Sequence, residues 1–189
     1  MLRFCKHLLA VCVLFASLAC AAEPPLANQG NKMSPHNTYF GLLKQPVVIN
    51  PANNNGAIVQ LENFSDKLIL LRNEERYDMW SDWLRDAYDE RTPVYVVARK
   101  QDGVIQDIRV ASLRRIDSLV LSTDKQQLKV GMLPSPSYYH VSVTHPRFKD
   151  IQETLQRSLD NQKQVYIVPG GPLEILDVRV PDPNWLQRR

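Results

Sequence analysis

An apolar pair beside a row of carboxylates, both on one predicted helix, forms the best candidate binding surface in this sequence. Met79 and Trp83 fall outside the stripe that the helix is expected to bury, and acidic residues four positions apart run alongside them. We expect these residues to lie outside the domain's own core, where an aromatic anchor with acidic neighbours favours a basic protein partner. The predicted partner-binding residues on this helix are Met79, Trp83, Asp86 and Glu90.

Two short acid–base pairs offer a second kind of polar site. Asp107 precedes Arg109 by two residues, and Asp177 precedes Arg179 by two, so each pair lies on one face of a predicted strand. The pairs could form twin polar sites for a ligand. The simpler interpretation, which we prefer, is a solvent-facing ladder of cross-strand charges.

Residues for catalysis, metal binding or cofactor binding do not form a set in this sequence. There is no Gly-x-Ser-x-Gly elbow and no phosphate-binding glycine loop. His140 and His145 have no evident third ligand, and zinc needs three or four. We therefore expect a protein that is not an enzyme and that has no cofactor and no metal.

The first 22 residues have the pattern of a secretory signal peptide. Arg3 and Lys6 precede an apolar run that ends in small residues near Ala22. Cys20 provides an alternative, in which it is the acylated first residue of a lipoprotein and the lipid is the only membrane attachment. All three cysteines lie at or before Cys20, which is typical of bacterial rather than animal export. We expect a periplasmic or secreted protein, or else a membrane-anchored lipoprotein.

The charge of the chain argues against nucleic acid as a partner. Loss of the signal region would remove Arg3 and Lys6 and lower the formal net charge from +3 to +1. Binding to a phosphate backbone needs a clear basic excess. We therefore expect the partner to be another protein of the bacterial cell envelope, within a protein complex, and a basic protein would suit the acidic helix.

The body of the chain reads as a tandem duplication. Val94-Tyr95-Val96-Val97 recurs as Val165-Tyr166-Ile167-Val168, and the Asp-x-Arg pairs recur at a similar offset. Each unit is predicted as β-β-β-α-β-β, an α+β class rich in antiparallel strands. That order occurs in oligonucleotide/oligosaccharide-binding (OB) barrels. The rival arrangement is an open α+β sheet with a βαβ crossover.

The predicted helices match best between the two units. Their buried stripes are Tyr77, Trp80, Leu84 and Tyr88 in the first, and Phe148, Ile151, Leu155 and Leu159 in the second. Asn73 and Thr144 precede them at equivalent positions and are predicted as helix caps.

The predicted organisation has five segments: a signal peptide (1–22), a flexible leader (23–45), a first repeat (46–113), a second repeat (114–180) and a C-terminal tail (181–189). The tail contains two prolines, which oppose helix and sheet, and then Trp185. Trp185 is a further predicted partner contact, and the alternative is a strap packed on its own domain. Should the protein instead bind a small ligand or act as an enzyme, its site is expected in the cleft between the repeats.

Overall fold

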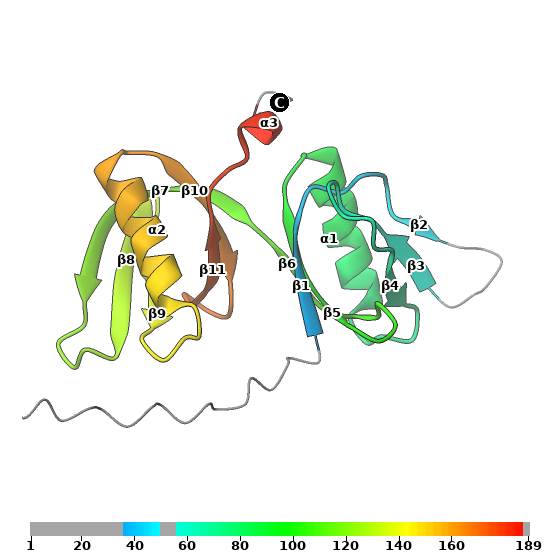
Figure 1. Ribbon diagram of the computed structural model, residues 1–189, viewed down its shortest axis with the longest axis horizontal. Coiled ribbons are helices and arrows are strands. Elements are labelled where there is room, and N and C mark those ends of the chain that lie inside the picture. Colours follow the sequence, from blue (N-terminus) through cyan, green and yellow to red (C-terminus); the bar gives the residue numbers. More distant parts are fainter. Residues whose placement is uncertain (1–35, 50–55, 187–189) are drawn as a thin grey trace, which may run out of the picture. The chain divides into compact units, whose positions relative to one another are not determined.

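The computed structural model describes residues 36–49 and 56–186. The predicted signal peptide and Cys20 lie outside these residues. The described chain is a mixed α+β protein, rich in antiparallel strands and with few helices (Figure 1). Below, residues 36–110 are called the N-terminal half and residues 112–180 the C-terminal half.

The N-terminal half contains two small sheets and one long helix. In the first sheet, strand β5 pairs antiparallel with β1 on one side and with β6 on the other. In the second sheet, strand β3 lies between β2 and β4 and pairs antiparallel with both. An antiparallel bridge from Leu43 to Leu61 and a parallel bridge from Ile69 to Val104 connect the sheets. The elements are β1 (His36–Gly41), β2 (Val48–Ile49), β3 (Gly56–Val59), β4 (Leu68–Leu71), α1 (Tyr77–Asp89), β5 (Val94–Arg99) and β6 (Ile105–Val110).

The C-terminal half has a single sheet in the order β11-β10-β7-β8-β9, with every pairing antiparallel. A parallel bridge between His140 and Glu174 connects β9 with the residue just before β11, which links the two outer strands. The elements are β7 (Ser112–Leu121), β8 (Gln127–Leu133), β9 (Tyr138–Ser142), α2 (Phe148–Asp160), β10 (Gln164–Pro169), β11 (Ile175–Arg179) and, beyond the sheet, the short α3 (Pro183–Leu186).

Both long helices bury most of the predicted stripe, whereas Tyr88, Phe148 and Leu159 are only partly buried. Leu84 of α1 and Leu155 of α2 are completely buried, because apolar residues recur at helical spacing on one face only. The cap predictions are wrong. The N-cap residues are Arg76 and Arg147, and neither forms a side-chain cap hydrogen bond. Asn73 and Thr144 lie too early, because each helix begins four residues after them, at Tyr77 or Phe148.

Each half has its own core, and a third apolar cluster contains residues of both halves. Its most buried members are Tyr95, Ala111, Tyr166 and Val168, with Val97 packed against them. Tyr95 and Val97 alternate on β5 with the residues of the N-terminal core, and Tyr166 and Val168 alternate on β10 with those of the C-terminal core. Each of these strands therefore uses one face for its own core and the other for the shared cluster.

The boundaries at both ends of the first predicted repeat need correction. The leader predicted over 23–45 and the repeat start at 46 are wrong for residues 36–41, which form β1 and pair with β5. The region is rich in Asn and Pro, which are uncommon in strands, so the composition predicted a leader although Tyr39 points into the core. The predicted boundary between residues 113 and 114 is also wrong, because it falls inside β7, which follows β6 after the buried Ala111.

Candidate functional site

Helix α1 carries a cavity at the predicted partner-binding residues. This α1 pocket has a volume of about 400 Å³ and is lined by Trp83, Asp86, Ala87, Glu90, Arg109, Val110 and Pro169. Arg109 is already paired with Asp107, whereas among the described residues neither Asp86 nor Glu90 has an ion-pair partner. The pocket therefore combines an aromatic wall with two uncompensated carboxylates.

Met79 and Trp83 differ in how far they reach into solvent. Met79 is 41% exposed and does not line the pocket, although it lies one helical turn before Trp83. Trp83 is half-buried and packs against the N-terminal core, so the expectation that it stands clear of the core is wrong. Its ring serves both as a core contact and as a wall of the α1 pocket.

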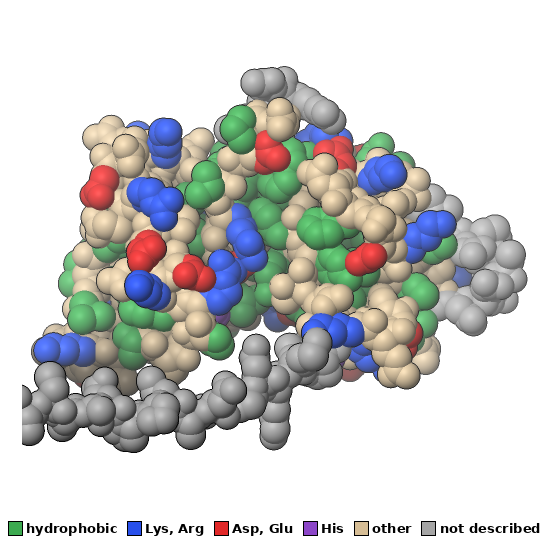
Figure 2. Space-filling view, in the orientation of Figure 1, with side chains coloured by type: hydrophobic (Ala, Val, Ile, Leu, Met, Phe, Trp, Pro, Cys, Tyr) green, Lys and Arg blue, Asp and Glu red, His purple; other side chains and the backbone are tan. Residues whose placement is uncertain are grey.

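Helix α2 carries a second and larger cavity at matching positions. This α2 pocket has a volume of about 550 Å³ and a mainly apolar lining, to which Leu113, Val165 and Val180 contribute. Arg157 and Lys163 also line it, and no acidic residue does. Within the described chain neither cation has an ion-pair partner. More generally, the face of the molecule in Figure 2 has Lys and Arg side chains interspersed with hydrophobic ones.

Aligning the first residues of the two helices places the pockets on equivalent positions. Trp83 of α1 matches Thr154 of α2, so the α2 pocket lacks the large ring that narrows the α1 pocket. Asp86 matches Arg157, which reverses the charge at this point. The two cavities lie in corresponding places but differ in volume and in the sign of the unpaired charges that line them.

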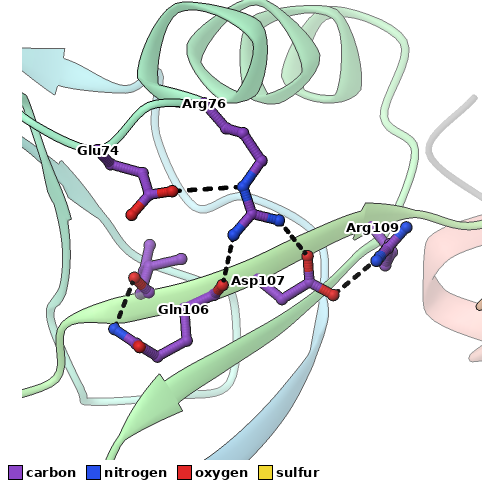
Figure 3. Close-up of polar contacts among 6 residues, drawn as sticks. Glu74, Arg76, Gln106, Asp107 and Arg109 are labelled. Carbon is purple, nitrogen blue, oxygen red and sulfur yellow. Dashed lines mark hydrogen bonds and ion pairs between the residues drawn. The ribbon is translucent and has the colours of Figure 1, made fainter.

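A polar cluster connects the start of each helix to the strand beneath it. Figure 3 shows Arg76 reaching from the start of α1 to Asp107 of β6, with Nη1 3.5 Å from Oδ1. The other carboxylate oxygen accepts a hydrogen bond from Arg109 Nε at 2.8 Å. Arg76 also donates to Glu74 and to the carbonyl oxygen of Gln106. Asp107 therefore lies between two guanidinium groups.

The C-terminal half repeats this arrangement more tightly. Arg147 Nη1 is 2.6 Å from Asp177 Oδ1, and Arg179 Nε is 2.8 Å from Oδ2. Asp177 is only 2% exposed and also accepts a hydrogen bond from the Val178 amide. Tyr95 of the N-terminal half lies close enough to Asp177 for the charge of that carboxylate to act on its phenol. Burial, and after it the charge of Asp177, raises the pKa of the Tyr95 phenol.

The two clusters act as structural clamps in this arrangement. Each carboxylate accepts from two arginines, one before the helix and one on the strand, and so holds the start of the helix to the strand. The expected solvent-facing ladder of cross-strand charges is wrong, because Asp177 is 2% exposed and each aspartate pairs with an arginine of its own strand. The prediction also missed Arg76 and Arg147. An arginine directly before each helix, at equivalent positions, was the feature that could have revealed them.

Trp185, the remaining predicted contact, packs within the chain. Its ring centroid is 5.8 Å from that of Phe40 and 6.3 Å from that of Tyr166. It is half-buried as part of the shared apolar cluster, which does not contain Met79 or Trp83. A role for Trp185 in partner binding stays a prediction. In the described residues no three His, Cys, Asp or Glu side chains are grouped as metal ligands.

The comparisons with known proteins give no relative: no family model, no curated protein and no solved structure matches the chain. Among the described residues, no helix has the length and apolar character needed to cross a bilayer.

Proposed function

We propose that this chain is an exported, non-enzymatic binding protein of the bacterial cell envelope that works as a component of a protein complex. Its proposed contact is the outer surface of α1, comprising Met79 and the α1 pocket. The observation that carries the proposal is the contrast between matched positions: α1 has Met79 and Trp83 where α2 has Asp150 and Thr154. This difference lies beside the stripe that the two helices share, where Met79 is exposed and Trp83 is half-buried.

The chemistry of the α1 surface favours a basic protein segment. Asp86 and Glu90 are exposed and unpaired among the described residues, so they can attract a Lys or Arg side chain. The exposed Met79 and the half-buried Trp83 that lines the pocket supply apolar contact beside them. Aromatic and methionine side chains are enriched at interfaces of this kind.

Export to the periplasm or beyond is part of the same proposal. It rests on the order of charged, apolar and small residues over 1–22, and Cys20 retains the alternative of a lipid anchor. N-terminal sequencing of the chain isolated from cells should begin at Ala22 or Glu23. An acylated Cys20 at the first position would favour the lipoprotein, and an intact Met1 would contradict export.

We further infer that the two halves are tandem copies of an OB-like unit. The parallel bridges Ile69–Val104 and His140–Glu174 are offset by about seventy residues, like the repeated sequence. The register shifts after Val97 and after Val168 also fall at equivalent places. Around the C-terminal half the strands follow the order β7-β8-β9-β11-β10, and five strands with the helix after the third are typical of OB barrels.

The alternative of a ligand or substrate site in a cleft between the repeats has weaker support. Both halves contribute side chains, among them Tyr95 and Tyr166, to one buried apolar cluster. Ligand sites are hollows with a few polar groups. The α1 pocket is a hollow that includes Pro169, but its polar groups suit a protein side chain as well as a ligand.

Site-specific photocrosslinking in intact cells tests the proposed contact. A photoreactive residue at Met79 should yield a discrete adduct, whose second component mass spectrometry identifies. The matched control position is Glu153, which is exposed on α2 and lines neither pocket. Reversing the charges with Asp86→Lys and Glu90→Lys should weaken capture at least about tenfold, the loss expected from about 1.4 kcal/mol. Equal capture from both positions, or capture indifferent to charge reversal, would contradict the proposal.

A further inference from the structure

We propose that the α2 pocket receives helix α1 of a second copy of this chain. The inference rests on the proposed function, because it names the partner of the α1 surface. Each molecule would then carry both the acidic surface and the basic pocket that accepts it.

The α2 pocket has the chemistry to accept such a helix. Its lining is mainly apolar and includes Val180, which is 65% exposed. Arg157 and Lys163 are at this lining without an ion-pair partner among the described residues. Many other arginines of the chain, including Arg109 and Arg179, are already paired with carboxylates. A carboxylate brought to this pocket therefore meets cations that have no competing anion.

The outward face of α1 has the complementary composition in a usable order. Met79, Trp83, Asp86 and Glu90 are spaced by four, three and four residues, so they follow one stripe of the helix. Helices that dock into grooves present anchors at this spacing. Met79, as the exposed apolar group of the stripe, would enter the hollow beside Val180, and the two acids would face Arg157 and Lys163.

The reversal of charge at equivalent positions points to a second copy rather than to an unrelated protein. Where α1 has Asp86, α2 has Arg157, and where α1 has the bulky Trp83, α2 has the smaller Thr154. The two helix surfaces thus differ in complementary ways in charge and in bulk. A formal net charge of only +3 for the whole chain gives little long-range repulsion between copies.

Complementation by charge reversal tests the inference. One variant carries Asp86→Lys and Glu90→Lys, and the other carries Arg157→Glu and Lys163→Glu. Sedimentation velocity of the purified full chain over a concentration series should show association of the wild type that weakens with added salt. Each variant alone should associate at least about tenfold more weakly, and an equimolar mixture of the two should recover it, because acidic and basic surfaces again match.

Two further variants separate pocket filling from charge. Thr154→Trp places in the α2 pocket the side chain that the α1 pocket carries, and should abolish association without changing any charge. Matched reversals at exposed positions outside both pockets, Asp117→Lys with Glu153→Lys, should leave association unchanged. Circular dichroism melting confirms that each variant is folded.

A wild type that stays monomeric at every concentration, or variants whose mixture does not recover association, would overturn the inference. The proposed function would survive that result if crosslinking at Met79 in cells still captured a different protein. If crosslinking captured only a second copy, both proposals would stand. If it captured nothing, the proposed function would fail independently of the sedimentation result.

Discussion

Among three aspartates that form ion pairs, removal of the buried Asp177 side chain should lower the free energy of unfolding most. We compare Asp177→Ala, Asp107→Ala and Asp82→Ala, whose side chains are 2%, 23% and 63% exposed. Each accepts from at least one arginine, so the three changes remove the same chemistry from increasingly solvated positions. The free energy of unfolding should fall most for Asp177 and least for Asp82.

The expected magnitudes follow from the burial of each carboxylate and from the hydrogen bonds that it accepts. Asp177→Ala leaves two arginines and the Val178 amide without their acceptor, and losing one partner of a buried pair costs about 3 to 5 kcal/mol. The side chains of Arg147 and Arg179 are each more than a third exposed, and Arg147 keeps its ion pair with Asp150, so both effects offset part of the loss and we expect about 3 kcal/mol.

The two comparison sites should respond less. Asp107→Ala should cost about 1 kcal/mol, since its contact to Arg76 is long at 3.5 Å and water reaches the carboxylate. Asp82→Ala removes an exposed pair with Arg85 and should cost less than about 0.5 kcal/mol.

Urea unfolding at neutral pH, followed by circular dichroism and tryptophan fluorescence, measures all three losses. Asp177→Asn, which keeps the shape and one acceptor oxygen, serves as a conservative control and should cost less than Asp177→Ala. The reasoning from burial would be refuted if the three alanine variants lost equal stability, or if Asp82→Ala lost most.

Three further predictions concern stability. Leu84→Ala and Leu155→Ala should each cost about 2 to 5 kcal/mol in urea unfolding, because both side chains are completely buried in their own cores, and a loss under about 0.5 kcal/mol would contradict that packing. Burial raises the pKa of Tyr95 from 10.0, so above pH 10 the folded chain keeps a proton that the unfolded chain loses. The free energy of unfolding should therefore fall as pH rises above 10. In urea titrations at alkaline pH, Tyr95→Phe should make this fall less steep. Gly56→Ala should lower the melting temperature measured by calorimetry, because φ is +139° and a Cβ would collide with the Leu70 carbonyl oxygen, whereas Gly41→Ala, whose Cβ would meet no atom closer than 3.5 Å, should change it little.

The sequence was sufficient to predict the elements with strong periodicity. Leu84 and Leu155 could be placed in buried stripes because a helix repeats its apolar positions over several turns. Strand β1 could not be predicted in this way. Its apolar residues, Tyr39 and Phe40, are adjacent and point in opposite directions, into the N-terminal core and into the shared cluster. Alternation is lost when both faces of a short strand are covered.

The exposure of one candidate residue could be predicted, but the shape of the pocket could not. The outward position of Met79 could be read from its place beside the shared stripe, and it is exposed. The half-burial of Trp83 depends on how α1 lies on β6, which residue spacing on one helix does not contain. The α2 pocket was missed for the same reason, since Leu113 and Val180, which line it, are far from Arg157 along the chain.

The contact between Phe40 and Trp185 has a consequence for the order of folding. These rings are separated by more than 140 residues in sequence, yet their centroids lie 5.8 Å apart. Closing so long a loop costs entropy that only later contacts repay, so we expect this region to consolidate last, after each half has formed its local structure. Until then Phe40, Tyr95 and Tyr166 present an uncovered aromatic surface. We expect the nascent protein to be most prone to aggregation during that interval.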